Sequence, residues 1–191
     1  MMQRIVIFAS GSGTNAENII QHFQDSPVAR VSWVLCNKEE AGVLDRAERL
    51  GVPSRVFTKK ELFSQEFLDF VKAEADFIVL AGFLLKIPDE LTRSFDKAMV
   101  NIHPALLPKY GGKGMYGMNV HRAVVENGEA ESGITIHYVN ENYDEGAIIF
   151  QKSVALNPGD EPEDVARKIH LLEQAHFPSV VESVLEKSNE G

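Results

Sequence analysis

Five short apolar runs alternate with amphipathic segments up to His103, and this alternation restricts the fold more than any other feature of the sequence. The apolar runs cover residues 4–9, 29–37, 54–57, 76–83 and 97–103. Segments with apolar residues at helical spacing lie between them, at residues 14–23, 41–51, 59–75 and 88–95. Strands that alternate with helices are typical of a parallel sheet with helices on both faces. The pattern therefore predicts a doubly wound α/β fold.

The second part of the chain has a different pattern. Residues 109–119 are rich in glycine and predict irregular structure. Residues 132–156 alternate with a period of two around a polar loop, which predicts an antiparallel hairpin at the end of a mostly parallel sheet. Residues 161–188 predict a long C-terminal helix, and we expect Pro178 to interrupt or kink it. Because the hairpin can extend the same sheet, we expect residues 1–191 to form a single domain.

The composition limits where such a chain works. Apolar residues make up 44% of the 191 residues, enough for a substantial core, and no apolar run is long enough for a transmembrane helix. The N-terminal apolar run is too short for a secretory signal and is followed at once by glycine-rich sequence. The single cysteine, Cys36, cannot form an internal disulfide. A reducing, cytoplasmic location fits these observations best.

The net charge limits the partners. The formal charge is −9 and the isoelectric point is about 5.2. Nucleic-acid binding needs clustered lysine and arginine, so an acidic surface argues against a nucleic-acid partner. A small anionic ligand stays possible, because backbone N–H groups at a helix N-terminus can hold it without a net positive charge. We therefore expect small-molecule partners, without nucleic acid or membrane, and leave monomer and homodimer open.

A glycine-rich turn separates the first predicted strand from the first predicted helix. Gly11 and Gly13 allow the backbone to approach a ligand closely, and either Thr14 or Asn15 is expected to cap the helix. The N–H groups of Gly13, Thr14 and Asn15 have no helical partner and lie at the positive end of the helix dipole. The turn therefore predicts a site for a phosphate or a carboxylate.

The turn can be compared with two nucleotide-binding motifs and with a turn that binds no ligand. Gly11, Gly13 and Ala16 match the dinucleotide pattern G-x-G-x-x-G/A, but the acidic residue expected after the second strand is missing, since Glu39 comes late. The phosphate-binding loop pattern also fails, because no Lys-Ser/Thr pair follows the glycines. A tight turn without any ligand stays an alternative.

Asn101 and His103 stand two residues apart at the end of a predicted strand, so their side chains share one face. An asparagine amide can donate to a developing oxyanion, and a histidine titrates near neutral pH. Asp144, in the loop of the predicted hairpin, is a candidate carboxylate that would raise the pKa of the imidazole. Sequence spacing does not pair Asp144 with His103, and structural roles for all three residues stay equally open on this basis.

Four segments carry a family resemblance. They are ASGSGTN at residues 9–15, LAGF at 80–83, NIHPALLPKY at 101–110 and ENYDEGAII at 141–149. In this order they resemble segments of the folate-dependent formyltransferases, over nearly the whole chain. The resemblance implies transfer of a formyl group from 10-formyltetrahydrofolate, as co-substrate, to the amine of glycinamide ribonucleotide. The amine would attack directly through a tetrahedral intermediate, with neither a metal nor an acyl-enzyme.

Rival activities stay open within and outside this family. A formyltetrahydrofolate deformylase, a methionyl-tRNA formyltransferase and a sugar-amine formyltransferase share the chemistry. We expect an extra N-terminal domain in the first, and an extra C-terminal domain and a basic surface in the second. Outside the family, a nicotinamide-dependent oxidoreductase is an alternative, but this sequence lacks the acidic residue that such an enzyme needs after the second strand. A non-catalytic nucleotide-binding module would not need the Asn101 and His103 pair.

The resemblance also implies roles for individual residues. Asn101 would bind the formyl oxygen, protonated His103 would stabilise the oxyanion and donate a proton, and Asp144 would keep the imidazole charged. For the ribonucleotide, the implied residues are Gly13, Thr14, Asn15, His170 and Glu173. For folate, they are Lys59, Leu84, Leu85, Lys86, Ile87, Asn101, Asn140, Glu141, Asn142, Tyr143 and Asp144.

Several residues depart from the family pattern or have a plainer interpretation. Leu85 stands where many relatives carry an arginine, so the pterin pocket is expected to differ in detail. The glycine-rich insert at 111–117 is either a flap near the folate tail or a longer surface loop. His121 and His176 are interpreted as packing or surface groups, and His137 as a residue that can line the site. The six histidines show no metal-ligand spacing.

Overall fold

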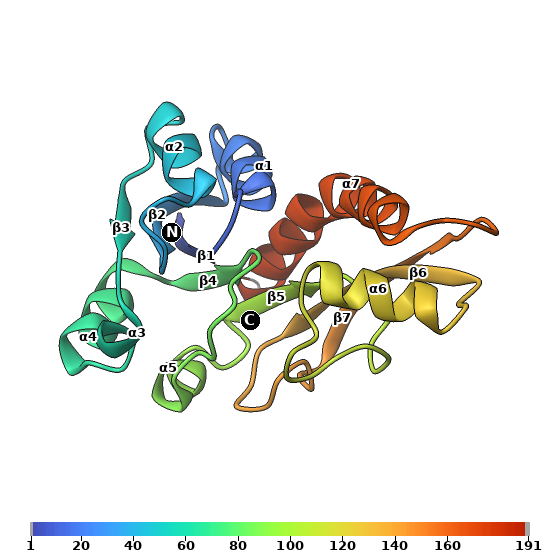
Figure 1. Cartoon of the computed structure of the whole chain (residues 1–191). Helices are drawn as coiled ribbons and strands as arrows, with labels where there is room; N and C mark the ends of the chain where they lie inside the picture. The colour runs from blue at the N-terminus through green and yellow to red at the C-terminus, as the bar shows by residue number, and fades with distance from the viewer. Residues whose placement is uncertain (1, 190–191) are drawn as a thin grey trace.

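The computed structural model describes residues 2–189, and its strands form a seven-stranded sheet in the order β3-β2-β1-β4-β5-β6-β7. The strands are β1 (Gln3–Ala9), β2 (Ala29–Cys36), β3 (Ser54–Val56), β4 (Phe77–Leu80), β5 (Met99–His103), β6 (Glu131–Tyr138) and β7 (Ile148–Ala155). β1 to β5 pair in parallel, whereas β6 and β7 pair antiparallel. The predicted mostly parallel sheet with a C-terminal antiparallel hairpin is confirmed (Figure 1).

Helices cover both faces of the sheet. They are α1 (Thr14–Phe23), α2 (Gly42–Arg49), α3 (Lys59–Leu62), α4 (Gln65–Glu74), α5 (Asp89–Ser94), α6 (Met118–Glu126) and α7 (Pro162–Asn189). Successive side chains of β1 divide between two apolar clusters: Ile5 and Ile7 pack toward α1, α2, α6 and α7, while Val6 and Phe8 pack toward α3, α4 and α5. Fully buried parallel strands of this kind are typical of doubly wound folds. No helix within the described residues has the length and apolar character needed to span a bilayer.

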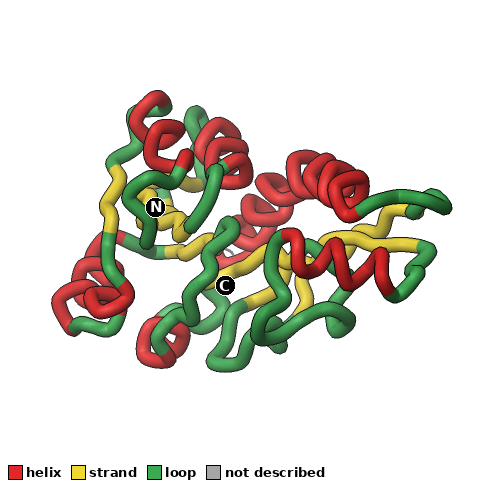
Figure 2. Tube along the Cα trace, in the orientation of Figure 1, coloured by secondary structure: helices red, strands yellow, loops and turns green. Residues whose placement is uncertain are grey.

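Three loops meet at the carboxyl ends of the central strands. They follow β4, β5 and β6 and appear as long green segments in Figure 2. The loop after β5 contacts the loop after β6, because the Gly112 N–H donates to Oδ2 of Asp144 at 2.9 Å. The loop after β6 is tied to α5 by an ion pair between Arg93 and Glu141. Open α/β sheets bind their ligands at this edge, so a ligand site is expected among these loops.

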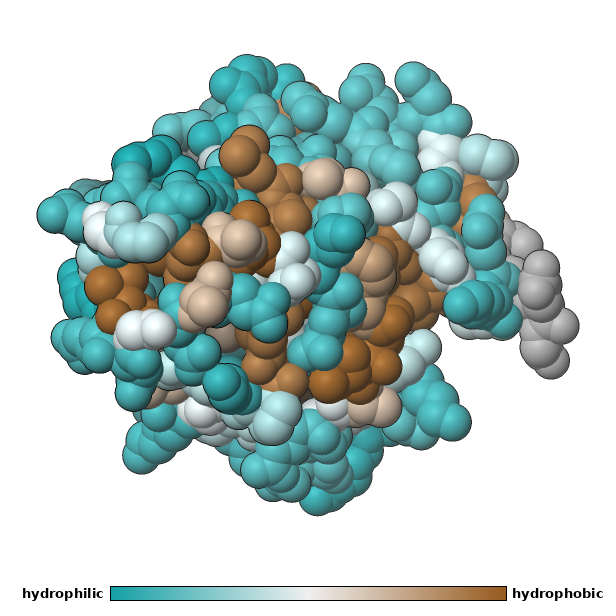
Figure 3. Space-filling view, turned by 90° about the vertical axis from the view of Figure 1, so that its right-hand side faces the viewer, coloured by the Kyte–Doolittle hydropathy of each residue, from teal (hydrophilic) through white to brown (hydrophobic). Residues whose placement is uncertain are grey.

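β7 forms one edge of the sheet and pairs only with β6. The face turned toward this side of the molecule has broad apolar surface in its middle (Figure 3). Ile148 on β7 and Leu171 on α7 are among the large apolar side chains that stay exposed. Lys152 in the middle of β7 opposes edge-to-edge pairing with another sheet, since a charged side chain has to be desolvated there.

The predicted helix at 59–75 is wrong in one respect, because the structure divides it into α3 and α4. Thr58 caps α3 with a complete capping box involving Glu61, and Ser64 starts α4 by accepting a hydrogen bond from the Phe67 N–H. The apolar spacing continues across the break, so periodicity alone merges the two helices. A serine in the middle of the segment competes for the backbone and starts a new helix there.

The predicted cap of the first helix is also wrong. Gly13 is the N-cap residue, in a left-handed conformation with φ of 80°, and no side chain caps α1. A Cβ atom at Gly13 would lie 2.6 Å from Cα of Val43 on α2, so only glycine fits between the two helices. Thr14 and Asn15 are therefore inside the helix, and their side chains are free for other contacts.

Pro178 does not interrupt α7, which continues through it to Asn189. Proline lacks the N–H that would bond the carbonyl of Gln174, four residues earlier. In this structure Nδ2 of Asn18 on α1 donates to that carbonyl at 3.0 Å. The carbonyl that proline leaves free therefore has a partner from another helix, which offsets the loss within α7.

Candidate active site

Asn101 and His103 lie at the carboxyl end of β5, at the loop-covered edge of the sheet. His103 is buried, at 4% exposure, and its Nε2 donates to the carbonyl oxygen of Tyr110 at 2.7 Å. Because a carbonyl only accepts, Nε2 carries a hydrogen, and Nδ1 is the nitrogen that faces the site. Tyr110 holds a left-handed backbone conformation, with φ of 56°, which turns its carbonyl toward the ring.

Asp144 is brought to this histidine by the loop between β6 and β7, as predicted from the resemblance. Its Oδ2 lies 3.6 Å from Nδ1 of His103, close enough for electrostatic attraction but too far for a hydrogen bond. The same oxygen accepts from the Gly112 N–H at 2.9 Å. Asp144 itself has φ of 56°, a conformation that aspartate adopts more readily than most residues. The start of the glycine-rich insert is thus part of the site.

His137, interpreted from the sequence as a residue that can line the site, completes the cluster. It lies directly opposite Asn101 in the β5–β6 ladder, and its Nε2 accepts from Nδ2 of Asn101 at 3.1 Å. Its Nδ1 donates to the Tyr138 carbonyl at 2.8 Å, and its Nε2 is 3.5 Å from Oδ1 of Asp144. The cross-strand register is the signal that could have found it, since His137 faces the same side as the residue it pairs with.

The expected charge state of His103 is wrong for the unliganded protein. Burial lowers the pKa of His103 below its ordinary value, and the opposing effects of Asp144 and the Tyr110 carbonyl do not overcome it. The histidine is therefore neutral at pH 7, with an unprotonated Nδ1. Burial depends on the tertiary fold and cannot be read from a carboxylate in the sequence. The arrangement suits a group that accepts a proton during a reaction.

Asp144, in contrast, stays ionised. Burial disfavours its charge, but contacts with His137, His103 and the Gly112 N–H together hold the pKa of this carboxyl below its usual value. A fixed negative charge beside a neutral imidazole stabilises the imidazolium once a proton arrives. His121 on α6 is buried, and its pKa is lowered, mainly by burial and secondarily by His103. This fits the packing role predicted for His121.

The turn after β1 has the form expected of an anion site. The N–H groups of Thr14 and Asn15 open α1, where helices leave backbone donors without helical partners. Arg46 on α2 holds the carbonyl of Ser12, with its Nε at 2.8 Å, and also pairs with Glu17 on α1. The carbonyl of Ser12 is thereby held toward α2. This arrangement can bind a phosphate through backbone groups and the helix dipole.

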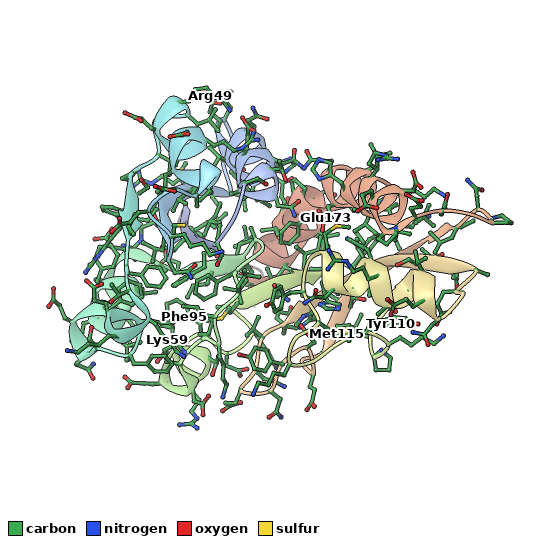
Figure 4. All side chains as sticks on the ribbon, viewed as in Figure 1. Arg49, Lys59, Phe95, Tyr110, Met115 and Glu173 are labelled. Carbon is green, nitrogen blue, oxygen red and sulfur yellow. The ribbon has the colours of Figure 1, made fainter. Side chains whose placement is uncertain are left out.

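Glu173 on α7 lies against the start of α1 (Figure 4). Its Oε2 accepts from Nδ2 of Asn15 at 3.1 Å and is 3.8 Å from Nδ1 of His170. Burial raises the pKa of Glu173, against the opposing effects of Asn15 and His170. A largely buried carboxylate without a lysine or arginine partner favours a ligand that supplies positive charge. The structure thus brings the predicted residues Asn15, His170 and Glu173 together.

The residues predicted to bind folate lie on two loops, after β4 and after β6, except for Lys59 at the start of α3. Leu85 and Ile87 in the loop after β4 pack with Val139 in one apolar cluster. The backbone N–H of Leu84 donates to Oγ of Ser10, at the end of β1, at 3.0 Å, so this loop is joined to the glycine-rich turn. The side chain of Lys86 forms an ion pair with Asp89 at 2.9 Å.

In the second loop, Asn140 accepts a hydrogen bond from the Asn142 N–H, Glu141 pairs with Arg93, and Tyr143 is exposed. Asp144 belongs to the same loop and joins it to His103. Lys59 begins α3 on the surface, well separated from Glu173 (Figure 4). A role for Lys59 stays a prediction.

Comparison with known proteins shows which family the chain resembles. The family model described as formyl transferase matches residues 3–181. A phosphoribosylglycinamide formyltransferase of Bacillus subtilis is 34% identical, over all of this chain and 98% of its own length. The solved structure of glycinamide ribonucleotide transformylase 1 from Geobacillus kaustophilus superposes with a TM-score of 0.86 at 35% identity, covering 97% of this chain and 100% of that one.

A chloroplastic phosphoribosylglycinamide formyltransferase of Arabidopsis thaliana is 39% identical over 97% of this chain. The chain spans just under two thirds of that relative, 66% of its length. An α/β fold with a partly buried Asn–His–Asp cluster at the edge of a mostly parallel sheet defines the class of protein. The chain belongs to the formyl transferase family.

Proposed function

We propose that this protein transfers a formyl group from 10-formyltetrahydrofolate to the amine of glycinamide ribonucleotide. The observation that carries the proposal is the grouping of four polar side chains at the end of β5. Polar atoms of Asn101 and His137, of His137 and Asp144, and of Asp144 and His103 lie 3.1, 3.5 and 3.6 Å apart. The names of the relatives support the same activity. A deformylase shares the chemistry but would not need an amine-binding carboxylate such as Glu173.

Two substrates would occupy the two parts of the site. The phosphate of the ribonucleotide would bind the N–H groups of Gly13, Thr14 and Asn15, and its amine end would lie near Glu173 and His170. The folate donor would lie on the loop after β4 and the loop after β6, with Lys59 as a candidate for its tail. The residues on these loops are Leu84, Leu85, Lys86, Ile87, Asn140, Glu141, Asn142, Tyr143 and Asp144.

The neutral state of His103 suits a proton shuttle. The amine nitrogen forms a bond to the formyl carbon, and the carbonyl oxygen becomes an oxyanion. Nδ1 of His103 takes the proton that the amine loses, directly or through water, and the imidazolium is stabilised by Asp144. The proton then goes to N10 of the folate as the bond between N10 and the formyl carbon breaks. Formyl carbon, proton and electron pairs balance without another reactant.

Asn101 would stabilise the oxyanion. One hydrogen of its Nδ2 is held by His137 at 3.1 Å, which fixes the plane of the amide. The second hydrogen is then available for the formyl oxygen, and a donor held in place before reaction stabilises developing charge efficiently. The newly formed imidazolium of His103 adds to this stabilisation.

The location and other partners stay predictions. Among residues 2–189, no three or more His, Cys, Asp or Glu side chains are grouped so as to hold a metal ion. We propose small-molecule partners, and a cytoplasmic location stays the prediction from the composition. The Arabidopsis relative is named as chloroplastic.

A folate turnover assay tests the proposal. The protein is incubated with 10-formyltetrahydrofolate, with and without glycinamide ribonucleotide, and deformylated folate is followed by absorbance. We expect turnover only when the ribonucleotide is present, and formylated ribonucleotide as product. Turnover without any amine would indicate a deformylase instead.

Variants of the cluster test the mechanism. His103→Ala and Asp144→Asn are each expected to reduce formyl transfer by orders of magnitude, about 10²- to 10⁴-fold, while the fold is kept. Circular dichroism checks the fold. Near-wild-type turnover in either folded variant would contradict the assigned roles.

A further inference from the structure

Pro178 lies inside α7 and is buried, five residues beyond Glu173. A proline here removes the hydrogen bond to the carbonyl of Gln174 and is costly in a helix interior. That carbonyl accepts instead from Nδ2 of Asn18 on α1, at 3.0 Å. A regular helix uses such a carbonyl internally, so the proline makes it available to a neighbouring helix.

The bond from Asn18 is one of three that join α1 to a single turn of α7. Nδ2 of Asn15 donates to Oε2 of Glu173 at 3.1 Å, and Nε2 of Gln174 donates to the carbonyl of Thr14 at 3.4 Å. Asn15 and Asn18 stand three residues apart and so face the same side of α1. α1 and α7 pack side by side, and Glu173 faces this junction (Figures 1 and 4).

The three bonds connect two elements with different tasks. The N-terminus of α1 carries the N–H groups that would hold the phosphate of the ribonucleotide, and α7 carries the carboxylate that would hold its amine end. The two ends of one ligand are joined by covalent bonds, so both contacts form only if the separation between them is set correctly. A misplacement of about 1 Å is enough to weaken such binding strongly.

We propose that Asn18 and Pro178 are a positioning pair. Pro178 releases the carbonyl of Gln174, and Asn18 uses that carbonyl to fix Glu173 at a set distance from the phosphate turn. Neither residue is expected to touch substrate, so both act through Glu173 and Asn15. This inference rests on the proposed function and adds two residues that determine the affinity for the ribonucleotide.

Asn18 and Pro178 could instead have a purely structural role. In that case α7 tolerates the proline, and Asn18 only provides a partner for a half-buried carbonyl that would otherwise be unsatisfied. Both roles predict that Asn18→Ala lowers the thermal midpoint. They differ once Pro178→Ala is added, because the alanine N–H restores the bond to Gln174 within α7. The link to α1 stays broken in that double variant.

Titration calorimetry with glycinamide ribonucleotide tests the pair on the full chain, in the wild type, Asn18→Ala, Pro178→Ala and the double variant. We expect Asn18→Ala to raise the Kd by about tenfold, because the phosphate turn and Glu173 are no longer held at the separation that the ligand requires. The double variant is expected to recover its thermal midpoint while its Kd stays raised. Gln21→Ala, an exposed position one turn further along α1, is the matched control and is expected to change neither quantity.

Three results would overturn the inference or the activity, and they are separable. Wild-type affinity in a folded Asn18→Ala protein would overturn the positioning role. Recovery of both stability and affinity in the double variant would reduce Asn18 to the purely structural role. If Asn18→Ala fails to fold, the double variant alone decides between the two roles. Absence of ribonucleotide binding by the wild type would instead contradict the proposed function.

Discussion

Nε2 of His137 accepts a hydrogen bond from Nδ2 of Asn101 at 3.1 Å, directly across the antiparallel pair of β5 and β6. Nδ1 of the same ring donates to the Tyr138 carbonyl, so both ring nitrogens are engaged and the ring cannot turn freely. The amide of Asn101 is therefore held in one plane before any substrate arrives. A site in which a donor is fixed in advance needs little reorganisation when negative charge develops.

His137→Phe tests this orientation. Phenylalanine keeps the ring shape but cannot accept from Asn101, so the amide becomes free to rotate. We expect kcat to fall by about ten- to a hundredfold, less than the effect of removing an oxyanion donor outright, with a smaller change in KM. Steady-state kinetics measure the split. His22→Gln, which changes only a surface ion pair between α1 and Glu182 on α7, serves as a control. An unchanged kcat in folded His137→Phe would refute the role.

The pH profile tests whether His103 starts neutral. Since its pKa in the folded protein lies below the ordinary value of about 6.5, the imidazole is neutral at pH 7 and gains its proton only as the pH falls through the lowered pKa. We expect kcat/KM to be lost on that acid side. A proton donor that must start charged would give the reverse, with activity lost as the pH rises.

Asp144→Asn separates the titration of His103 from that of the substrate. The substrate amine titrates in the same way with the wild type and the variant, so any shift of the acid limb comes from the protein. Without the carboxylate, only the hydrogen bond to the Tyr110 carbonyl still opposes the effect of burial, so the pKa of His103 falls further. The acid limb is expected to move to lower pH while the plateau drops. Asp69→Asn, at an exposed position on α4, is the control. An acid limb that stays in place in Asp144→Asn would exclude His103 as its source.

Much of this fold could be predicted from the sequence, because the strands and helices of a doubly wound sheet have strong local patterns. The division of 59–75 could not, since Ser64 competes with a periodicity that spans the break. Where α7 continues through Pro178, the carbonyl left without a helical partner is bonded by Asn18, which is 160 residues away from the proline in the chain. The sequence pattern of the α7 segment alone carries no information about a partner on another helix.

The site shows the same division between local and tertiary information. Asn101 and His103 could be paired from their spacing on one strand, and the family resemblance supplied Asp144. The role of His137 depends on the register between β5 and β6, which no single segment encodes. The neutral state of His103 follows from burial by several elements, so the sequence suggested the opposite charge.

Glu173→Gln is expected to make the protein more stable and less able to bind its substrate. Burial raises the pKa of Glu173, so the folded state holds its proton more tightly than the unfolded state. The stability linked to this group is present at low pH and is lost as the pH rises through the raised pKa. Glutamine carries no charge, so the loss of stability at high pH is removed, and its side-chain oxygen can still accept the hydrogen bond from Asn15.

Thermal unfolding of Glu173→Gln at several pH values checks the sign. The midpoint is expected to exceed that of the wild type at pH 8, and the difference is expected to vanish in acid. The KM for glycinamide ribonucleotide is expected to rise by about ten- to a hundredfold, as for loss of a charged hydrogen bond. Glu186→Gln, at an exposed position on the same helix, is the control. A lower midpoint at pH 8 would show that the carboxylate is stabilising after all.

Gly13 and Gly11 offer a matched pair for the phosphate turn. At Gly13, φ is 80° and an added Cβ would lie 2.6 Å from Cα of Val43, which is fully buried on α2. Gly13→Ala therefore has to strain the backbone or separate α1 from α2, and we expect a loss of about 2 kcal/mol or more. At Gly11, an added Cβ meets no atom within 4 Å, so Gly11→Ala is expected to change stability by about 0.5 kcal/mol at most.

Chemical denaturation of the two variants measures the difference, and phosphate-site function is measured separately by the KM for the ribonucleotide. Because the turn is distorted only in Gly13→Ala, that variant is expected to lose both stability and ribonucleotide affinity. Gly11→Ala is expected to keep its stability, so any rise in its KM reports on the space that the ligand needs beside the turn. Equal stability of the two variants would mean that α2 yields to the extra methyl group, and that Gly13 is not required for the packing of α1 on α2.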